Sequence, residues 1–111
     1  MSDFIVPVRY QEQGIRTGLA VQNADEKTVL VELTLLDAQG EELLGQSPVT
    51  IEIPARGHMA RFVDELFSIP ASPLFVGTLT AVVQSGAVAA IALEQGPEPG
   101  EFTTLPVAPL R

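Results

Sequence analysis

The chain has 111 residues, a length that suits about one domain with one hydrophobic core. Its hydrophobic share of 46% consists mainly of aliphatic residues, with five Phe, one Tyr and no Trp, a composition typical of a β-sheet core and not of a disordered chain. Fourteen acidic and six basic residues give a formal charge of −8, which argues against nucleic acid or an anionic membrane as partner.

Cysteine is absent, which excludes a disulfide framework and thiolate chemistry. Residues 1–7 lack the basic start and apolar stretch of a signal peptide, and no run approaches the roughly 18 apolar residues of a membrane span. We therefore expect a chain without membrane insertion, either on its own or as a domain of a longer secreted parent.

The first two elements are predicted strands. Phe4–Tyr10 alternates in polarity and contains Pro7, which is tolerated mainly in edge strands, so we expect an edge strand. Residues 15–22 resume as a strand in which Gly18 and Ala20 leave room for close packing on one face.

The clearest strand covers residues 28–36. One face of this strand carries only aliphatic side chains and is expected to point into the core: Val29, Val31, Leu33 and Leu35. Residues 37–40 form a predicted turn into a short returning strand at 41–44, which together give a hairpin. Val49–Ile53 alternates again and is the next predicted strand.

Residues 58–67 have a different periodicity. The apolar positions follow the i, i+3, i+4 spacing of an amphipathic helix: Met59, Phe62, Val63, Leu66 and Phe67. Pro70 and Pro73 prevent its continuation. The sequence therefore predicts a helix of about three turns that covers one end or edge of the sheets.

Three strands complete the chain. Residues 74–84 form one, and residues 88–93 another that is apolar on both faces, so we expect a central strand covered on each side, with the helix docked on its alanine face. Residues 102–107 form a last short strand after the loop at 96–100. The count of about seven to nine strands predicts an all-β, two-sheet antiparallel β-sandwich over residues 1–111, with one short amphipathic helix.

Catalytic and metal-site residues are scarce. His58 is the single histidine, and zinc needs three or four ligands, so a structural role near the helix start is favoured. A serine triad would need a hydroxyl near His58, but no serine has the Gly-x-Ser-x-Gly context of a nucleophile: Ser47, Ser68, Ser72 and Ser85. We predict no enzyme activity, no catalytic, cofactor-binding or metal-binding residues, and no cofactor.

The sequence gives little support for acid–base catalysis, calcium binding or carbohydrate binding. Pairs that could act as general acid and base lie on expected turns, exposed faces or loops: Glu41 with Glu42, Asp64 with Glu65, and Glu98 with Glu101. Asp25–Glu26 and residues 37–42 offer oxygens for Ca²⁺ without matching a dedicated calcium loop. A carbohydrate platform is hard to build with Tyr10 as the only tyrosine and no tryptophan.

Five segments together carry a resemblance: residues 18–23, 33–37 with Gly40, 53–62 leading to 65–67, 75–79 and 102–107. In their order and spacing the chain resembles the immunoglobulin-like or fibronectin-like β-sandwich modules of large bacterial secreted and cell-surface proteins. The resemblance implies an extracellular, noncatalytic module that acts as a structural spacer or protein-interaction domain within a larger parent. It carries no site residues across.

The expected partners are proteins, either neighbouring domains or further copies of the chain. Exposed strand edges recruit partner strands, so self-assembly through Phe4–Tyr10 or residues 102–107 is the first alternative function. A carbohydrate- or calcium-binding module is the second.

Overall fold

A computed structural model gives the fold and describes residues 3–12, 14–42, 48–69, 74–84, 86–98 and 100–109. Strands and one short helix make up this part of the chain. In chain order they are β1 (Phe4–Tyr10), β2 (Arg16–Asn23), β3 (Val29–Leu36), β4 (Val49–Ile53), β5 (His58–Phe62), α1 (Val63–Leu66), β6 (Phe75–Val83), β7 (Val88–Gln95), β8 (Phe102–Leu105) and β9 (Ala108–Pro109).

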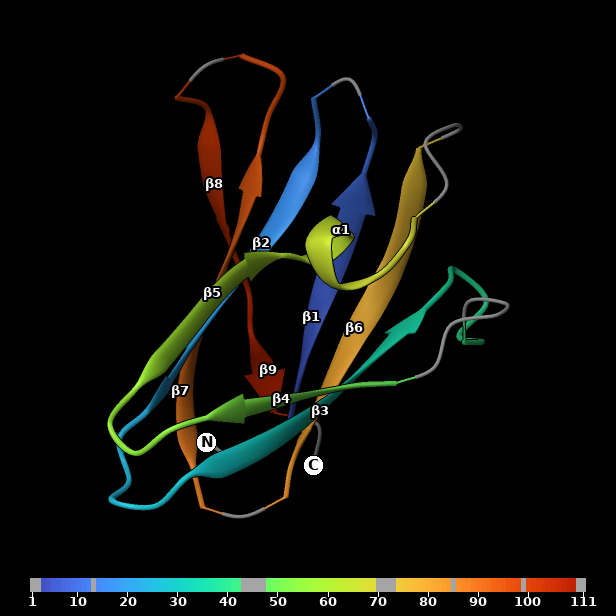
Figure 1. Ribbon diagram of the computed structural model, residues 1–111. Coiled ribbons are helices and arrows are strands. Elements are labelled where there is room, and N and C mark those ends of the chain that lie inside the picture. Colours follow the sequence, from blue (N-terminus) through green and yellow to red (C-terminus); the bar gives the residue numbers. More distant parts are fainter. Residues whose placement is uncertain are drawn as a thin grey trace.

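The strands form two antiparallel sheets that pack face to face (Figure 1). The five-stranded sheet has the order β4-β3-β6-β1-β9, and the four-stranded sheet has the order β5-β2-β7-β8. The chain passes from one sheet to the other six times, and two of these connections, β4 to β5 and β8 to β9, join the edge strands at the two lateral margins of the sandwich. The predicted two-sheet β-sandwich is confirmed.

The core lies between the sheets and follows the period-2 pattern of the sequence. In β3, the four side chains predicted to point inward are all buried, with exposures of 1% or less. They belong to one cluster with inward residues of β1, β6, β2 and β7, including Phe4, Val6, Leu79, Val21 and Val88. The buried residues are therefore the inward positions of strands that alternate in polarity, as expected for two stacked sheets.

The predicted helix at residues 58–67 is wrong for its first half. His58–Phe62 is the strand β5, paired with β2 from Gln22 opposite His58 to Gly18 opposite Phe62. Only Val63–Leu66 is helical, a single turn against β2 and β5. A helix of ten residues is marginal by itself, whereas pairing with β2 supplies backbone hydrogen bonds to the five-residue segment.

Two further expectations for the strands need correction or completion. Strand β1 is not at the edge, because β9 pairs beside it at Phe4 and Ile5. Pro7 lies beyond that short pairing and opposite Thr78 of β6.

The predicted turn at residues 37–40 is confirmed. Gly40 has a φ of 82°, and its N–H donates to the Asp37 carbonyl at 3.0 Å. Its returning strand is limited, among the described residues, to one bridge between Leu36 and Glu42, and residues 43–47, 70 and 73 lie outside the described residues.

Gly77 of β6 is a position where the backbones approach too closely for a side chain. A Cβ atom there would collide with the carbonyl oxygen of Leu36 and with the ring of Phe75. We expect Gly77→Ala to lower the free energy of unfolding by about 1 to 3 kcal/mol, since a backbone carbonyl can move little inside a sheet. Urea denaturation followed by circular dichroism measures the loss, with Gly40→Ala as the comparison: that glycine has open space around it, and only its positive φ disfavours alanine.

Candidate functional site

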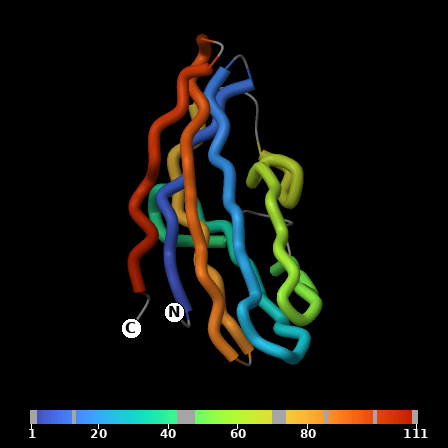
Figure 2. The backbone as a smooth tube through the Cα atoms, turned by 90° about the vertical axis from the view of Figure 1, so that its left-hand side faces the viewer, coloured from blue at the N-terminus to red at the C-terminus, as the bar shows by residue number. Residues whose placement is uncertain are grey.

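The outward side of the four-stranded sheet is unusually apolar. Figure 2 shows its strands side by side in the order β8, β7, β2, β5. Small or hydrophobic residues share this side across all four strands, and we call them the apolar face: Gly18, Ala20, Ala60, Phe62, Ile91, Leu93 and Phe102. An antiparallel sheet usually turns polar side chains to solvent, so this face departs from the common pattern.

Pairing register arranges these residues in rows across the sheet. Ala60, Ala20 and Ile91 form one row, because Ala20 is opposite Ala60 on one side and opposite Ile91 on the other. The next row contains Phe62, Gly18 and Leu93 in the same way. Gly18 therefore lies between two larger side chains, Phe62 and Leu93, whereas Ala20 has a larger neighbour only on β7, Ile91.

Gly18 is buried beside the ring of Phe62. A Cβ atom at Gly18 would lie 3.5 Å from the Phe62 ring and 3.5 Å from a methyl group of Leu93, in ordinary van der Waals contact with both. The guanidinium of Arg16 covers the ring, with its central carbon 3.7 Å from the ring centroid. Phe62 is thus held in place from two directions.

The same guanidinium forms a two-pronged ion pair with Asp64 of α1. Its Nε donates to Oδ1 at 3.2 Å and its Nη2 to Oδ2 at 3.0 Å. The Asp64 hydrogen bond raises the pKa of Arg16 above its ordinary value, against the opposing effect of desolvation. This ion pair links α1 to the start of β2. It lies at one end of the apolar face, where the charges of Arg16 and Asp64 neutralise each other.

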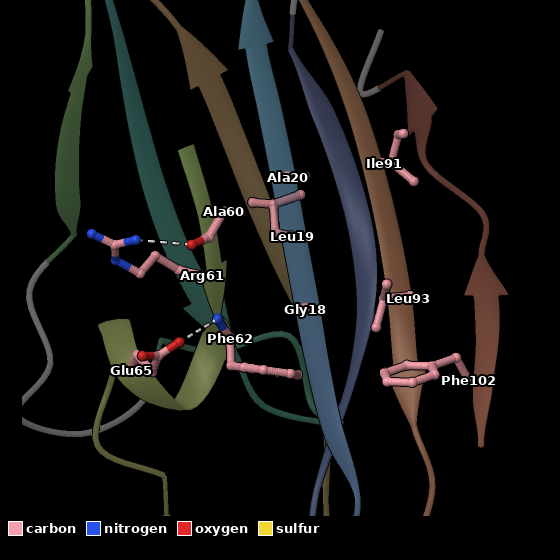
Figure 3. A pocket seen from close by; sticks show the side chains of 10 residues that line it. All are labelled: Gly18, Leu19, Ala20, Ala60, Arg61, Phe62, Glu65, Ile91, Leu93 and Phe102. Carbon is pink, nitrogen blue, oxygen red and sulfur yellow. Dashed lines mark hydrogen bonds between the residues drawn. The ribbon is translucent and has the colours of Figure 1, made fainter. Parts of the chain in front are cut away.

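Between these side chains the apolar face is hollowed into a groove of about 380 Å³. Leu19, Arg61 and Glu65 complete its lining. Figure 3 shows the Phe62 ring directed from β5 toward β2, and the Phe102 ring extending from β8 toward β7. The groove is lined almost wholly by apolar atoms.

Two large side chains of the apolar face are open to solvent. Ile91 is 62% exposed and Phe102 is 56% exposed. The expectation that β7 would be covered on both sides is wrong, since within the described ranges the helical turn packs on β2 and β5 and no element lies over Ile91. The apolar outer side of β7 is therefore available to another molecule.

The outward side of the five-stranded sheet is mixed. On its three inner strands, β3, β6 and β1, the outward positions include these charged and hydroxyl residues: Glu32, Thr34, Thr78, Thr80 and Arg9. They also include Leu30 and Val76, which are 36% and 49% exposed. Charged and hydroxyl side chains thus separate the exposed hydrophobic residues of this sheet.

Two backbone groups of the edge strand β5 are occupied by side chains of the same segment. A carboxylate oxygen of Glu65 accepts the N–H of Phe62 at 2.8 Å, and the guanidinium of Arg61 donates to the carbonyl of Ala60 at 2.9 Å. Such occupation reduces strand addition at an exposed sheet edge. A partner of this region would therefore meet the face more readily than the β5 edge.

The residues considered for catalysis do not converge in the part of the chain that the structure describes. His58 is exposed at the start of β5, in a shallow depression whose other lining residues carry no acid: Ala20, Val21, Gln22, Ala89 and Ile91. Ser68 is exposed after α1, whereas Ser47, Ser72 and Ser85 fall outside the described residues. No helix among the described residues has the length and apolarity to cross a membrane.

The acidic candidates serve local structure. Asp37 accepts the backbone N–H groups of Gln39 and Glu41 at 2.9 and 3.0 Å, and Glu26 pairs with Arg56 at 3.1 Å on the surface. Glu98 and Glu101 are exposed in their loop. Over the described ranges, no three His, Cys, Asp or Glu side chains gather in a way that could hold a metal ion.

Comparisons with known proteins bear on the fold alone. No family of known proteins matches the sequence, and no curated protein matches it either. Among solved structures, the chain is similar to the crystal structure of Thermotoga maritima 1070, with a TM-score of 0.68 and 14% sequence identity over 96% of this chain and 91% of that chain. At that identity the likeness shows a shared β-sandwich fold for nearly the whole chain.

Proposed function

We propose that the chain is a noncatalytic protein-interaction domain that binds its partner through the apolar face. One observation carries this proposal: large hydrophobic side chains, Ile91 and Phe102, project into solvent beside a groove floored by Gly18 and Ala20. Contiguous exposed apolar surface is typical of sites that are covered by another molecule. Its removal from water would contribute roughly 25 cal/mol per Å².

The chemistry of the groove supports binding over catalysis. Arg61 and Glu65 are the charged residues of its lining within the described ranges, and both already bond backbone groups of β5. The lining that the structure describes contains no hydroxyl, thiol or imidazole that could act as a nucleophile or proton shuttle. Immunoglobulin-like membership and an extracellular setting stay predictions of the sequence resemblance.

Site-specific photocrosslinking tests the proposal. A photoreactive benzoylphenylalanine at position 91 should crosslink the chain to a protein in the cells that produce it, while the same probe at position 52 should not. Glu52 is a matched control because it is an exposed strand residue on the other sheet. Mass spectrometry then identifies the partner, and its binding to the purified chain should be lost in Ile91→Asp. Equal crosslinking at both positions, or none at 91, would contradict the proposal.

A further inference from the structure

The edges of the two sheets are protected to different degrees. On β5, two side chains of the same segment already occupy backbone groups of the edge. On β1, beyond its short pairing with β9, Pro7 has no N–H, and the hydroxyl of Thr17 accepts the N–H of Arg9 and donates to its carbonyl, both at 3.0 Å. Edge strand β4 carries the exposed charge of Glu52. Proline, charge and occupied backbone groups are common means by which proteins prevent strand addition.

Strand β8 has none of these protections. It forms the other edge of the four-stranded sheet (Figure 1), and its four residues, Phe102–Leu105, include neither a charge nor a proline. Among the described residues, no strand pairs with β8 on its outer side, and no side chain bonds its backbone there. The edge of β8 is therefore open to strand addition.

The hydrogen-bond alternation of an antiparallel pair shows which backbone groups this edge offers. The Gly96 N–H donates to the Glu101 carbonyl at 2.7 Å, so these two residues are a hydrogen-bonded pair just before β8. Continuing the register, every second residue of β8 bonds to β7, and the N–H and C=O groups of Phe102 and Thr104 point away from it. The side chains of the same two residues lie on the side of the apolar face.

This register fixes the side-chain pattern of an added strand. Residues that bond Phe102 and Thr104 place their side chains beside those of these two residues, on the apolar side of the sheet. Phe102 is 56% exposed there, so apolar side chains at those positions are buried against its ring. The residue between them lies opposite Thr103, which is exposed and polar, so a polar side chain fits there. The added segment therefore alternates apolar and polar residues.

Charge selects among the polar residues of this segment. Glu98 and Glu101 are exposed in the loop that precedes β8, and the chain carries a formal charge of −8. Basic side chains are therefore attracted to this edge, whereas acidic segments, including those of a second copy of this chain, are repelled.

We infer that the partner adds an extended segment of alternating apolar and basic residues to β8, as a fifth strand of the four-stranded sheet; this inference rests on the proposed function. Main-chain hydrogen bonds hold the segment, and its apolar side chains extend the contact onto the apolar face beside Phe102. Because β8 offers the N–H and C=O groups of only two residues, the segment alone binds weakly, with a dissociation constant of about 100 µM or above.

NMR titration of the purified chain at about 0.15 M salt tests the inference with a synthetic peptide as probe. The peptide has about twelve residues in which Val and Lys alternate, and the control peptide has the same composition and charge in a repeating Val-Val-Lys-Lys order. We expect the alternating peptide to bind at least about 10-fold more tightly and to shift the backbone amide signals of Phe102 and Thr104 most. Equal binding of the two peptides, or shifts confined to other residues, overturns the inference.

Thr104→Pro removes one outward N–H without removing a hydrogen bond to β7, and it should weaken binding of the alternating peptide by about 10-fold. On the other sheet, the Gln84 N–H donates to the Leu30 carbonyl at 2.9 Å, so alternation directs the Thr50 N–H outward from edge strand β4. Thr50→Pro is therefore the matched control and should leave binding unchanged. If circular dichroism shows that Thr104→Pro does not fold, an α-hydroxy acid at position 104 removes the same N–H and gives the same test.

Crosslinking separates this inference from the proposed function. A partner that crosslinks at position 91 as strongly in Thr104→Pro as in the wild type uses the apolar face without the β8 edge, which overturns the inference and keeps the proposed function. If position 91 does not crosslink but the alternating peptide still binds at β8, the proposed function is removed and strand addition at β8 stands. Concentration-dependent shifts of the Phe102 and Thr104 amides without peptide would assign a second copy to this edge and overturn the inference.

Discussion

Leu33→Ala is expected to lower the free energy of unfolding by about 3 to 4 kcal/mol, near the middle of the range for fully buried leucines. Leu33 is 0% exposed and lies at the centre of β3, paired with Val49 of β4 on one side and Ala81 of β6 on the other. Truncation removes apolar contacts and leaves a cavity that neighbouring strands cannot close without shifting the register of the sheet. Urea denaturation monitored by circular dichroism gives the value directly.

Leu30→Ala is the matched control for that experiment. Leu30 belongs to the same strand and has the same side chain, but it points outward and is 36% exposed. Its loss should cost less than about 1 kcal/mol, because much of the side chain remains in water in the folded protein. Comparable losses for the two leucines would contradict the inward and outward assignment of β3, on which the two-sheet arrangement depends.

Strict alternation explains why β3 and β4 were predictable from sequence. In Val49–Ile53 the inward positions are hydrophobic and the outward positions are Thr50 and Glu52, and the structure follows that pattern. Alternation reports which side of a strand is buried, and in a two-sheet sandwich this nearly fixes the core.

The segment at residues 58–67 shows where the same reasoning fails. Met59, Phe62 and Val63 fit a helical period, but five residues are too few to separate helix from strand. Pairing with β2 decided the outcome, and that pairing joins residues about 40 positions apart in sequence. Local periodicity holds no information about such long-range hydrogen bonds, so tertiary context overrode it.

The candidate site was half visible in the sequence. The apolar character of both sides of β7 and the small residues Gly18 and Ala20 were apparent, but the helical periodicity of residues 58–67 predicted that the chain's own helix covers β7. Once the helix shrinks to Val63–Leu66, Ile91 is left open. A strand that is apolar on both faces therefore predicts that both faces are buried, but it does not show whether the same chain or another molecule covers the outer face.

Asn23 is the polar residue on which the joining of the two sheets depends. It is 0% exposed at the end of β2, and its Nδ2 lies 2.7 Å from the carbonyl of Lys27 and 3.1 Å from those of both Ile53 and Pro54. Its Oδ1 accepts the N–H of Asp25 at 2.9 Å. One amide thus links the turn after β2 to the end of β4 in the opposite sheet. The sequence alone predicts only an ordinary turn residue at this position.

Asn23→Ala is expected to lower the free energy of unfolding by about 2 to 4 kcal/mol, because it removes a donor and leaves buried carbonyls without their partner. Gln22→Ala, on the exposed neighbouring position, should change stability by less than about 0.5 kcal/mol. Thermal and urea denaturation of the two variants measure the difference. A small effect at Asn23 would show that water replaces the amide at this junction.

Asn23→Asp adds a pH-dependent test of the same contacts. Burial among carbonyl oxygens raises the pKa of the new carboxyl in the folded state above its unfolded value of about 3.9. Between these two pKa values the folded state binds more protons than the unfolded state, so stability falls as pH rises through that interval and is regained on acidification. The free energy of unfolding of the variant should therefore be furthest below that of the wild type at neutral pH. The difference should become small near about pH 4, where the protonated carboxyl group again donates a hydrogen bond to a carbonyl. Gln22→Asp, exposed to solvent, should show no such convergence; if both variants give the same pH profile, the side chain at position 23 does not face the carbonyls of Ile53 and Pro54.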